Sequence, residues 1–236
     1  MKLRTRVFTQ LAALGLVLAA YGFASDNAYL YVGNGIPGHD IANSVSPGYP
    51  VDILISGVCV RKGLAFGTIS DPFAFSPGTY DVQVSEANTL TPCSNATIAG
   101  LDVALGGGRS VSVVAAIDGG APSLLRFSDD LSSVTAGNAR FVFGQAAETG
   151  TLEATLTQLN VSDPKTYSVT ASAGTQQSIK VLAGTYLVQV FTSGGKTVLT
   201  SETIVLPDQA AIFTYATGQS ANNSISLINK TVAGLF

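Results

Sequence analysis

The chain is poor in the residues on which most metal sites and nucleic-acid contacts depend. Its 236 residues include no Trp, one His and two Cys, and only 11% of them are charged. So few His and Cys cannot form the ligand cluster that a zinc site needs. Twelve Lys and Arg against 15 Asp and Glu give a net charge of -3. No basic cluster occurs beyond the N-terminus, so we expect no nucleic-acid partner.

The motifs of common catalytic centres are also missing. No Gly-x-Ser-x-Gly sequence is present, and His39 is the one His that could serve a nucleophile as base. Gly106-Gly107-Gly108 precedes a strand pattern rather than a helix, so we interpret it as a hairpin turn and not as a phosphate loop. Asp129-Asp130 falls short of the roughly six to eight oxygens that calcium prefers, which favours a solvated linker. We predict a protein that is not an enzyme, with no catalytic residue, metal ligand or cofactor.

The first 24 residues have the pattern of an export signal. Lys2, Arg4 and Arg6 lie near the start of the chain, an apolar run follows from Leu11 to Ala20, and Gly22-Phe23-Ala24 ends in a small residue suited to cleavage. The run is too short to span a bilayer comfortably. Tyr21 stands where a bacterial lipoprotein signal has its lipidated Cys, so the chain as written cannot be acylated there. We predict a signal peptide over residues 1–24 and an exported protein, either periplasmic, at the cell surface or extracellular.

The two cysteines, Cys59 and Cys93, both lie in the first half of the mature chain. In an oxidising compartment a lone pair of this kind favours a disulfide over a metal site. The alternative is two buried free thiols.

An internal repeat organises the remaining sequence. Residues 78–84, Gly-Thr-Tyr-Asp-Val-Gln-Val, return as residues 184–190, Gly-Thr-Tyr-Leu-Val-Gln-Val. Two further segments recur in the same order, one before this motif and one after it. In the second of these matches we align Val111 with Ala211. We predict two tandem domains, residues 25–130 and 137–236.

Within each copy the apolar residues alternate with polar ones, as in half-buried strands. Val82 and Val84 share one face of the motif strand, while Asp81 and Gln83 point the other way. Residues 51–60 predict a hairpin with Ser56-Gly57 as its two-residue loop. No segment after residue 24 has a convincing helical period. With about 100 residues per copy, we expect an all-β chain of two immunoglobulin-like β-sandwich domains.

These motifs resemble a known family. The Pro-Val-Asp-Ile-Leu-Ile-Ser-Gly hairpin at 50–57, Phe66-Gly67-Thr68 and the motif strand at 77–84 are similar to domain of unknown function 4397. The resemblance implies an exported, mostly bacterial β-sandwich domain that often occurs in tandem, and it implies no established activity. It is weaker over the second copy, where Phe-Gly-Thr is missing.

The irregular segment from Asn34 to Tyr49 is the candidate binding loop. It is longer than the corresponding turn of the family, and it contains His39, Asp40 and Tyr49. Loops at the end of a rigid sandwich are where such folds usually bind partners. The alternative is a passive insertion.

We expect a non-catalytic interaction or structural module of the cell envelope or extracellular matrix, whose partner is a protein or glycan at the cell surface. One alternative is a subunit of an extracellular filament that self-associates through sheet edges or exchanges the apolar tail from Ser224 to Phe236. The tail would otherwise form a last strand. A second alternative is a secreted carbohydrate-active hydrolase, which would need a cleft with two carboxylates about 5–10 Å apart.

Overall fold

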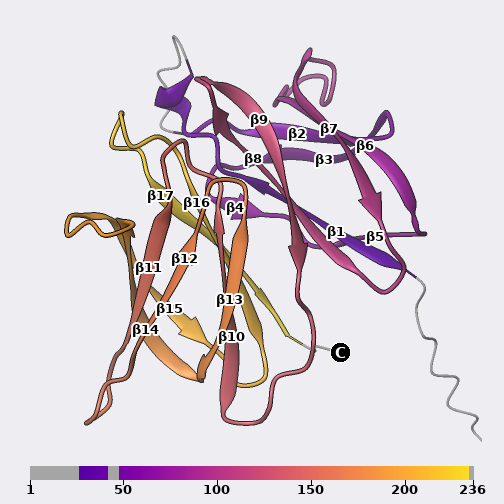
Figure 1. Cartoon of the computed structure of the whole chain (residues 1–236). Helices are drawn as coiled ribbons and strands as arrows, with labels where there is room; N and C mark the ends of the chain where they lie inside the picture. Colours follow the sequence, from indigo (N-terminus) through magenta and orange to yellow (C-terminus); the bar gives the residue numbers. More distant parts are fainter. Residues whose placement is uncertain (1–26, 42–47, 234–236) are drawn as a thin grey trace, which may run out of the picture.

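The computed structural model describes residues 27–41 and 48–233 (Figure 1). Within these ranges all regular structure is β-strand, apart from one 3-10 turn, η1 (Gly38–Asp40), so the all-β prediction is confirmed. No helix in this part of the chain is long and apolar enough to cross a membrane. The predicted signal peptide, residues 1–24, lies outside the described residues.

The first sandwich-like body consists of two sheets. Central sheet 1 has the strand order β4-β1-β8-β9, with β5 also paired to β1, and outer sheet 1 has the order β3-β2-β6-β7. The strands of this body are β1 (Ala28–Asn34), β2 (Val51–Ile55), β3 (Val58–Leu64), β4 (Thr68–Ile69), β5 (Phe73–Phe75), β6 (Gly78–Glu86), β7 (Thr97–Leu105), β8 (Ser110–Asp118) and β9 (Ala121–Asp129).

The second body is built in the same way. Central sheet 2 has the order β13-β10-β16-β17, and outer sheet 2 has the order β12-β11-β14-β15. Its strands are β10 (Asn138–Gln145), β11 (Leu152–Gln158), β12 (Thr166–Ala171), β13 (Gln176–Leu182), β14 (Gly184–Thr192), β15 (Val198–Leu206), β16 (Ala211–Thr217) and β17 (Ser226–Val232).

Strand pairing shows how the two bodies correspond. In each body the first strand lies parallel to the second-to-last one, with Leu30 opposite Val111 and Phe141 opposite Ile212. Val111 therefore corresponds to Ile212, and the alignment of Val111 with Ala211 is wrong by one residue. The corrected pair is consistent with burial, because Val111 and Ile212 each belong to the core of their own body.

Two turns illustrate what local sequence does and does not determine. Ser56 and Gly57 both have positive φ, 49° and 78°, and connect β2 to β3 in the predicted hairpin. Gly106-Gly107-Gly108, in contrast, connects β7 of outer sheet 1 to β8 of central sheet 1. The hairpin interpretation of this turn is wrong, because its two strands belong to different sheets.

The repeated Gly-Thr-Tyr motif has a structural role in both bodies. The Tyr80 hydroxyl donates a hydrogen bond to the Ser76 carbonyl at 2.8 Å. The Tyr186 hydroxyl donates one to the Leu182 carbonyl, also at 2.8 Å. Each tyrosine thus bonds to the backbone four residues upstream and closes the turn before its own strand, which resembles a tyrosine corner. We attribute the repeat of this motif to folding.

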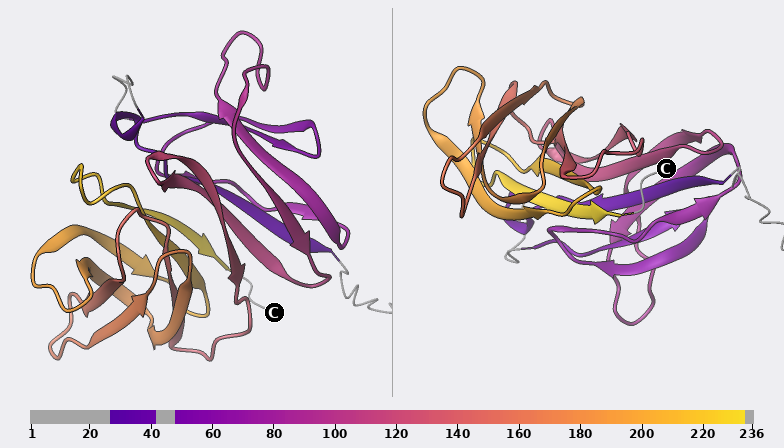
Figure 2. Two further views of the ribbon diagram at one scale, coloured as in Figure 1. Left: turned by 45° about the horizontal axis from the view of Figure 1, so that its top comes forward. Right: turned by 90° about the horizontal axis from the view of Figure 1, so that it is seen from below.

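Each body has its own hydrophobic core, and a third core joins the bodies. The outer faces of the two central sheets pack against each other, so the molecule has four layers (Figures 1 and 2). The buried residues of this third core, which we call the junction core, come from both bodies: Tyr31, Ile69, Val114, Ala116, Phe127, Val142, Ala146, Phe213, Tyr215 and Ile228. Because β8 and β16 lie between two packed layers, nearly all their residues are buried.

The bodies approach closely at two kinds of position. Aromatic rings meet across the junction, with ring centroids 6.2 Å apart for Tyr31 and Phe213 and 4.9 Å apart for Phe127 and Tyr215. At Gly35 the backbone of the first body comes so near the second that an added Cβ would lie 2.3 Å from Thr217 Cγ2. The junction is therefore packed like an interior, and the two bodies are expected to move as one unit.

Candidate functional site

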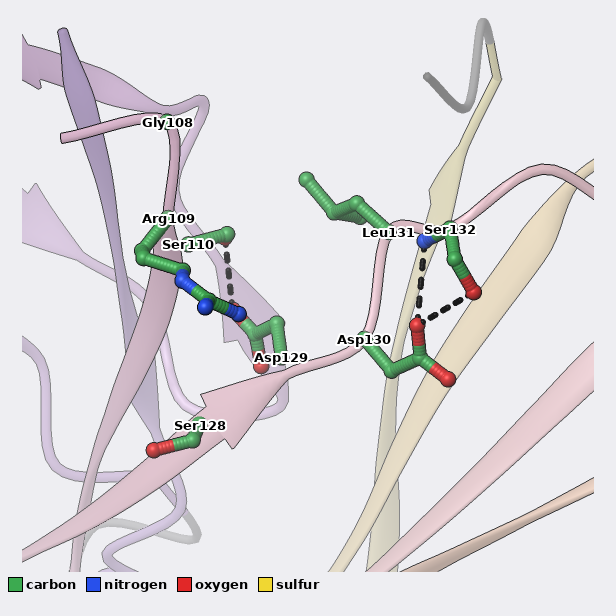
Figure 3. Close-up of a pocket in the computed structure, with 8 residues that line it drawn as sticks. All are labelled: Gly108, Arg109, Ser110, Ser128, Asp129, Asp130, Leu131 and Ser132. Carbon is green, nitrogen blue, oxygen red and sulfur yellow. Dashed lines mark hydrogen bonds between the residues drawn. The ribbon is translucent and has the colours of Figure 1, made fainter. Parts of the chain in front are cut away.

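A polar cleft of about 440 Å³ opens where β9 ends and the chain leads into the second body (Figure 3). The turn before β8, the end of β9 and the following linker form its walls. Apart from Leu131, the lining residues are small, polar or charged: Gly108, Arg109, Ser110, Ser128, Asp129, Asp130, Leu131 and Ser132. We therefore consider this polar cleft the candidate site for binding.

Asp129 lies between the cleft and the junction core. Its carboxylate accepts hydrogen bonds from Ser110 Oγ at 2.8 Å and Ser112 Oγ at 3.0 Å. A third comes across the junction from the hydroxyl of Tyr215, at 3.3 Å. Burial raises the pKa of Asp129 to about 6, although these hydroxyls and the charge of Arg126 act in the opposite direction. The carboxyl group therefore gains a proton in mildly acidic solution.

Asp130 has a different environment from its neighbour. Its burial alone would raise the pKa, but hydrogen bonds from Ser132 and the charge of Arg140 lower it. Arg140 is only 4% exposed, and its Nη1 lies 2.8 Å from Asp130 Oδ1. The same guanidinium donates to the carbonyls of Asp130 and Ser132 and to Ser132 Oγ. Arg140 thus fixes the path of the linker, and Asp130 remains charged at neutral pH.

The solvated-linker interpretation of Asp129-Asp130 is wrong for Asp129. This residue ends β9, and its carboxylate is withdrawn from solvent into the junction. Figure 3 shows the Asp129 side chain directed toward Ser110, whereas the Asp130 side chain turns toward Ser132. Across residues 27–41 and 48–233, no group of three or more His, Cys, Asp and Glu side chains could hold a metal ion.

Arg109 supplies the cleft with an available cation. Its backbone is held in the turn before β8, where the Arg109 amide donates to the Gly106 carbonyl at 3.1 Å. The side chain is exposed, and its guanidinium makes no hydrogen bond or ion pair with the described residues. Arg109 therefore differs from Arg140, whose donors are committed to the linker, and could bind a ligand without losing an internal contact.

The predicted binding loop lies at another part of the junction. Asp40 is 8% exposed, and its carboxylate accepts hydrogen bonds from Asn222 Nδ2 at 2.9 Å and from Ser224 Oγ. Both donors belong to the turn between β16 and β17. Figure 1 places η1, which contains Asp40, far from the lower end of β9 where the cleft opens. In the structure Asp40 therefore links the loop to the second body.

The other two residues named for the predicted loop, His39 and Tyr49, belong to different parts of it. His39 lies in η1 beside Asp40. Tyr49 packs against the core of the first body, where burial and the neighbouring Glu86 raise its pKa. The base of the loop is held by the fully buried Asn34, whose Nδ2 donates to the Tyr49 carbonyl at 2.7 Å. A partner-binding role for His39, Asp40 and Tyr49 remains a prediction.

Cys59 and Cys93 form the predicted disulfide, with their Cα atoms 5.9 Å apart. The bridge fixes the loop between β6 and β7 to strand β3. The carboxylate of Asp52 supports the same loop, because it accepts hydrogen bonds from the backbone N–H groups of Asn88 and Cys93. At the loop tip Leu90 is 91% exposed.

Sequence reasoning missed the junction and the buried roles of Asp52 and Asp129. One signal was present for the junction: β8 and β16 are nearly continuous apolar runs, which favours burial on both faces. No sequence signal distinguished Asp129 from Asp130. Side chains alternate between the two faces of a strand, but the sequence does not show whether the strand ends before or after Asp129.

A comparison with family models matches the family described as domain of unknown function (DUF4397) once, over residues 40–155. The resemblance is thus confirmed for one domain. The matched segment starts at the end of η1, covers the rest of the first body and ends in β11. The second body as a whole is not matched. A comparison with curated proteins gives no match to this chain.

Several solved structures are distantly similar. The Bacillus anthracis TIE protein is 9% identical, with 82% of this chain and 33% of that chain covered and a TM-score of 0.25. This chain thus spans about a third of that protein. A candidate cell adhesion protein from Bacteroides uniformis is 10% identical, with coverages of 89% and 99% and a TM-score of 0.28. One from Bacteroides ovatus is 8% identical, with coverages of 90% and 99% and a TM-score of 0.29. Likeness at this level says nothing about what this chain binds.

Proposed function

We propose that this protein is an exported, non-catalytic interaction module of the bacterial cell envelope or extracellular matrix, and that it binds a glycan in the cleft at the end of β9. The observation that carries the proposal is the combination of a rigid four-layer scaffold with a preformed polar cleft at its junction. A scaffold that does not deform holds its binding groups in place, so little entropy is lost on binding.

The chemistry of the cleft favours a ligand rich in hydroxyl groups. Ser128 provides a hydroxyl at its wall, and Arg109 provides uncommitted donors. Hydroxyl groups both donate and accept, so a sugar can satisfy such a mixed surface. An Arg can in addition bind a sugar carboxylate through two parallel hydrogen bonds. The cleft lacks the basic cluster that a polyphosphate would require.

A glycoside hydrolase is a weaker candidate. The cleft does contain two carboxylates, but Asp129 is occupied by three hydroxyl donors and Asp130 by Arg140 and Ser132. Their side chains also diverge (Figure 3). Two carboxylates that act on one glycosidic bond must face each other across it. We therefore favour binding over hydrolysis.

A strand-exchanging filament subunit is also disfavoured. Within the described part of the tail, β17 pairs with β16 from Ser226 to Val232, and Ile228 belongs to the junction core. Lending this strand to a neighbour would break that ladder and expose the junction. The tail serves its own chain as a last strand.

The finer aspects of the proposal concern compartment and fold type. We propose that residues 1–24 are removed as a signal peptide and that the protein acts in the periplasm, at the cell surface or outside the cell. The disulfide Cys59–Cys93 supports such a compartment, because disulfides persist in oxidising environments. We further propose that the two bodies are immunoglobulin-like, on the basis of their length and of the tyrosine that closes the turn before β6 and β14.

The proposal is tested by glycan binding of the mature chain, residues 25–236. An array of bacterial envelope and matrix glycans would identify a ligand, and calorimetry would measure its affinity. We expect Arg109→Ala to weaken binding about ten-fold or more, the loss of one charge-assisted contact. Arg61→Ala, on β3 of the first body, is the matched control and should bind normally.

Two results would contradict the proposal. Binding that Arg109→Ala leaves unchanged would place the ligand outside the cleft. Release of new reducing ends from any bound glycan would show catalysis.

A further inference from the structure

Strand β12 (Thr166–Ala171) differs from the other edge strands of this molecule. Exposed sheet edges carry unpaired backbone groups, and natural proteins usually blunt them with charged residues, bulges or a covering segment. Among the described strands at a sheet edge that exceed three residues, all but β12 contain a charged residue. The charged ones are β3 (Arg61, Lys62), β7 (Asp102), β9 (Arg126, Asp129), β13 (Lys180), β15 (Glu202) and β17 (Lys230).

The pairing of β12 is also more regular than that of the other edges of the two outer sheets, β3, β7 and β15, whose ladders all shift register. Its ladder with β11 runs in one register from Leu152–Ala171 to Thr157–Thr166. The corresponding ladder between β2 and β3 in the first body shifts register twice. The other edge of outer sheet 2, β15, is bridged by Asn229 of β17, whose Nδ2 donates to Glu202 Oε2 at 2.8 Å. Neither a charge, a bulge nor a bridging side chain blunts β12.

The backbone groups that β12 presents outward can be identified. The Gln158 N–H donates to the Lys165 carbonyl at 2.9 Å, one residue before β12 begins. Backbone groups alternate along an antiparallel strand, so those of Tyr167 and Val169 also point to β11. The N–H and C=O groups of Thr166, Ser168 and Thr170 therefore point away from the sheet. The side chains of these three residues are exposed on its outer face.

We propose that β12 is a pairing edge for a second copy of this chain, and that two copies form an antiparallel β12–β12 ladder about a two-fold axis through Ser168. The strand is self-complementary in this arrangement. Ser168 lies opposite itself, and Thr166 lies opposite Thr170 of the other copy, so hydroxyl side chains pair and no like charges meet. Outward backbone groups of one copy then meet those of the other.

The symmetry of this contact limits the assembly to two copies. A two-fold interface uses the same surface on both subunits and closes at a dimer, whereas a filament needs two different complementary edges. The remaining edge strands longer than three residues carry charges, so they do not offer the second contact. One short ladder buries less than the roughly 1,000 Å² of a stable interface, so we expect dissociation on the order of tens to hundreds of micromolar.

The dimer is tested by sedimentation of the mature chain over a concentration series. We expect a reversible shift from one to two copies. Ser168→Lys would place two ammonium groups opposite each other at the axis, and it should weaken association about ten-fold or more. Ser201→Lys, which makes the same change on the outer face of β15, should associate like the unaltered protein.

Amide hydrogen exchange gives a readout that needs no variant. The amides of Thr166, Ser168 and Thr170 should exchange fast in dilute protein and gain protection as concentration rises. Those of Tyr167 and Val169 should be protected throughout. A chain that stays monomeric at millimolar concentration, association lost in Ser201→Lys but not in Ser168→Lys, or growth beyond two copies would each overturn the proposal. None of these outcomes depends on whether the cleft binds a glycan.

Discussion

The two bodies share one strand order, yet they hold their third strand in different ways. In the first body the ladder between β2 and β3 is irregular, and a disulfide and the buried Asp52 support the region. Asp52 accepts a hydrogen bond at 2.7 Å from the N–H of Gly63, a residue of β3 with φ of 55°. In the second body the ladder between β11 and β12 is unbroken, and Glu153 takes the place of Asp52.

This difference shows that the same strand order is compatible with two ways of holding the third strand of a body, β3 or β12. Irregular strand β3 loses ladder hydrogen bonds, and a buried carboxylate and a covalent bridge compensate. The irregularity and the charges of Arg61 and Lys62 also make β3 a poor template for another strand. Strand β12 pairs regularly with β11 and has no such support, but the backbone groups of its outer edge are unpaired. Stability of the first body should therefore depend on specific residues, and that of the second on packing and on the junction.

The junction should respond most strongly to mutation. Phe213→Ala removes a side chain that is 1% exposed and contacts Tyr31 of the other body. We expect a loss of about 3–5 kcal/mol, because the cavity falls between two packed sheets. Calorimetry should then show two transitions in place of one, as the bodies unfold separately.

Phe191→Ala is the control for this prediction. Phe191 is a half-buried residue of β14 on the outer face of outer sheet 2, so its loss should cost much less and keep a single transition. If both variants behaved alike, the junction would not be what couples the bodies.

Loss of the disulfide should distinguish the bodies directly. We expect the double variant Cys59→Ser and Cys93→Ser to lose about 3–4 kcal/mol, because the bridge closes a loop with a sequence separation of 34. Hydrogen exchange should show that the loss falls on β2, β3, β6 and β7. Equal loosening of β11 and β14 would mean that the second body also depends on the bridge.

The pH dependence of stability should reveal Asp129. Its pKa is about 6 in the folded protein and near 3.9 in an unfolded chain, so the folded state binds the proton more tightly. Its contribution is fully present below about pH 4 and is lost as the pH rises through about 6. The loss amounts to about 3 kcal/mol.

Asp129→Asn removes this titration. Denaturant unfolding of both proteins from pH 4 to 7 would give the difference in free energy at each pH. That difference should shift in favour of the variant as the pH rises. A constant difference would mean that Asp129 keeps an ordinary pKa in the folded protein.

The smallest effect should come from the two tyrosines of the repeated Gly-Thr-Tyr motif. Tyr186 is fully buried, so Tyr186→Phe leaves the Leu182 carbonyl without its donor and should cost about 1 kcal/mol. The hydrogen bond of Tyr80 is exposed, and water can replace its hydroxyl in Tyr80→Phe. We expect a smaller loss there in chemical denaturation. A larger loss of stability in Tyr80→Phe than in Tyr186→Phe would mean that the tyrosine hydrogen bond contributes more to folding in the first body.

Much of each body could be predicted because its signals are local. The alternation in Val82 and Val84 gives a half-buried strand, and Ser56-Gly57 gives a two-residue turn with positive φ. The disulfide followed from the number of cysteines and the expected compartment. The strand register did not follow, because nearly every residue of β8 and β16 is buried and the apolar pattern therefore does not fix the alignment of the two strands.

The contacts that join the two bodies were outside the reach of sequence reasoning. Asp40 and Ser224, whose side chains are hydrogen-bonded, are 184 residues apart in the chain. Tyr215 and Asp129 are separated by 86. Such pairs depend on how the two central sheets dock, and no local pattern encodes the docking angle or offset.

The sequence by itself determined the class of this protein: an all-β chain of alternating strands with an internal repeat and a pair of cysteines suited to a disulfide. The tertiary structure alone decided that the two copies form one unit. Period-two patterns specify which face of a strand is apolar, but they do not say what covers it. In β8 and β16 both faces are buried, and only the packed sheets show that the second face of each contacts the other body.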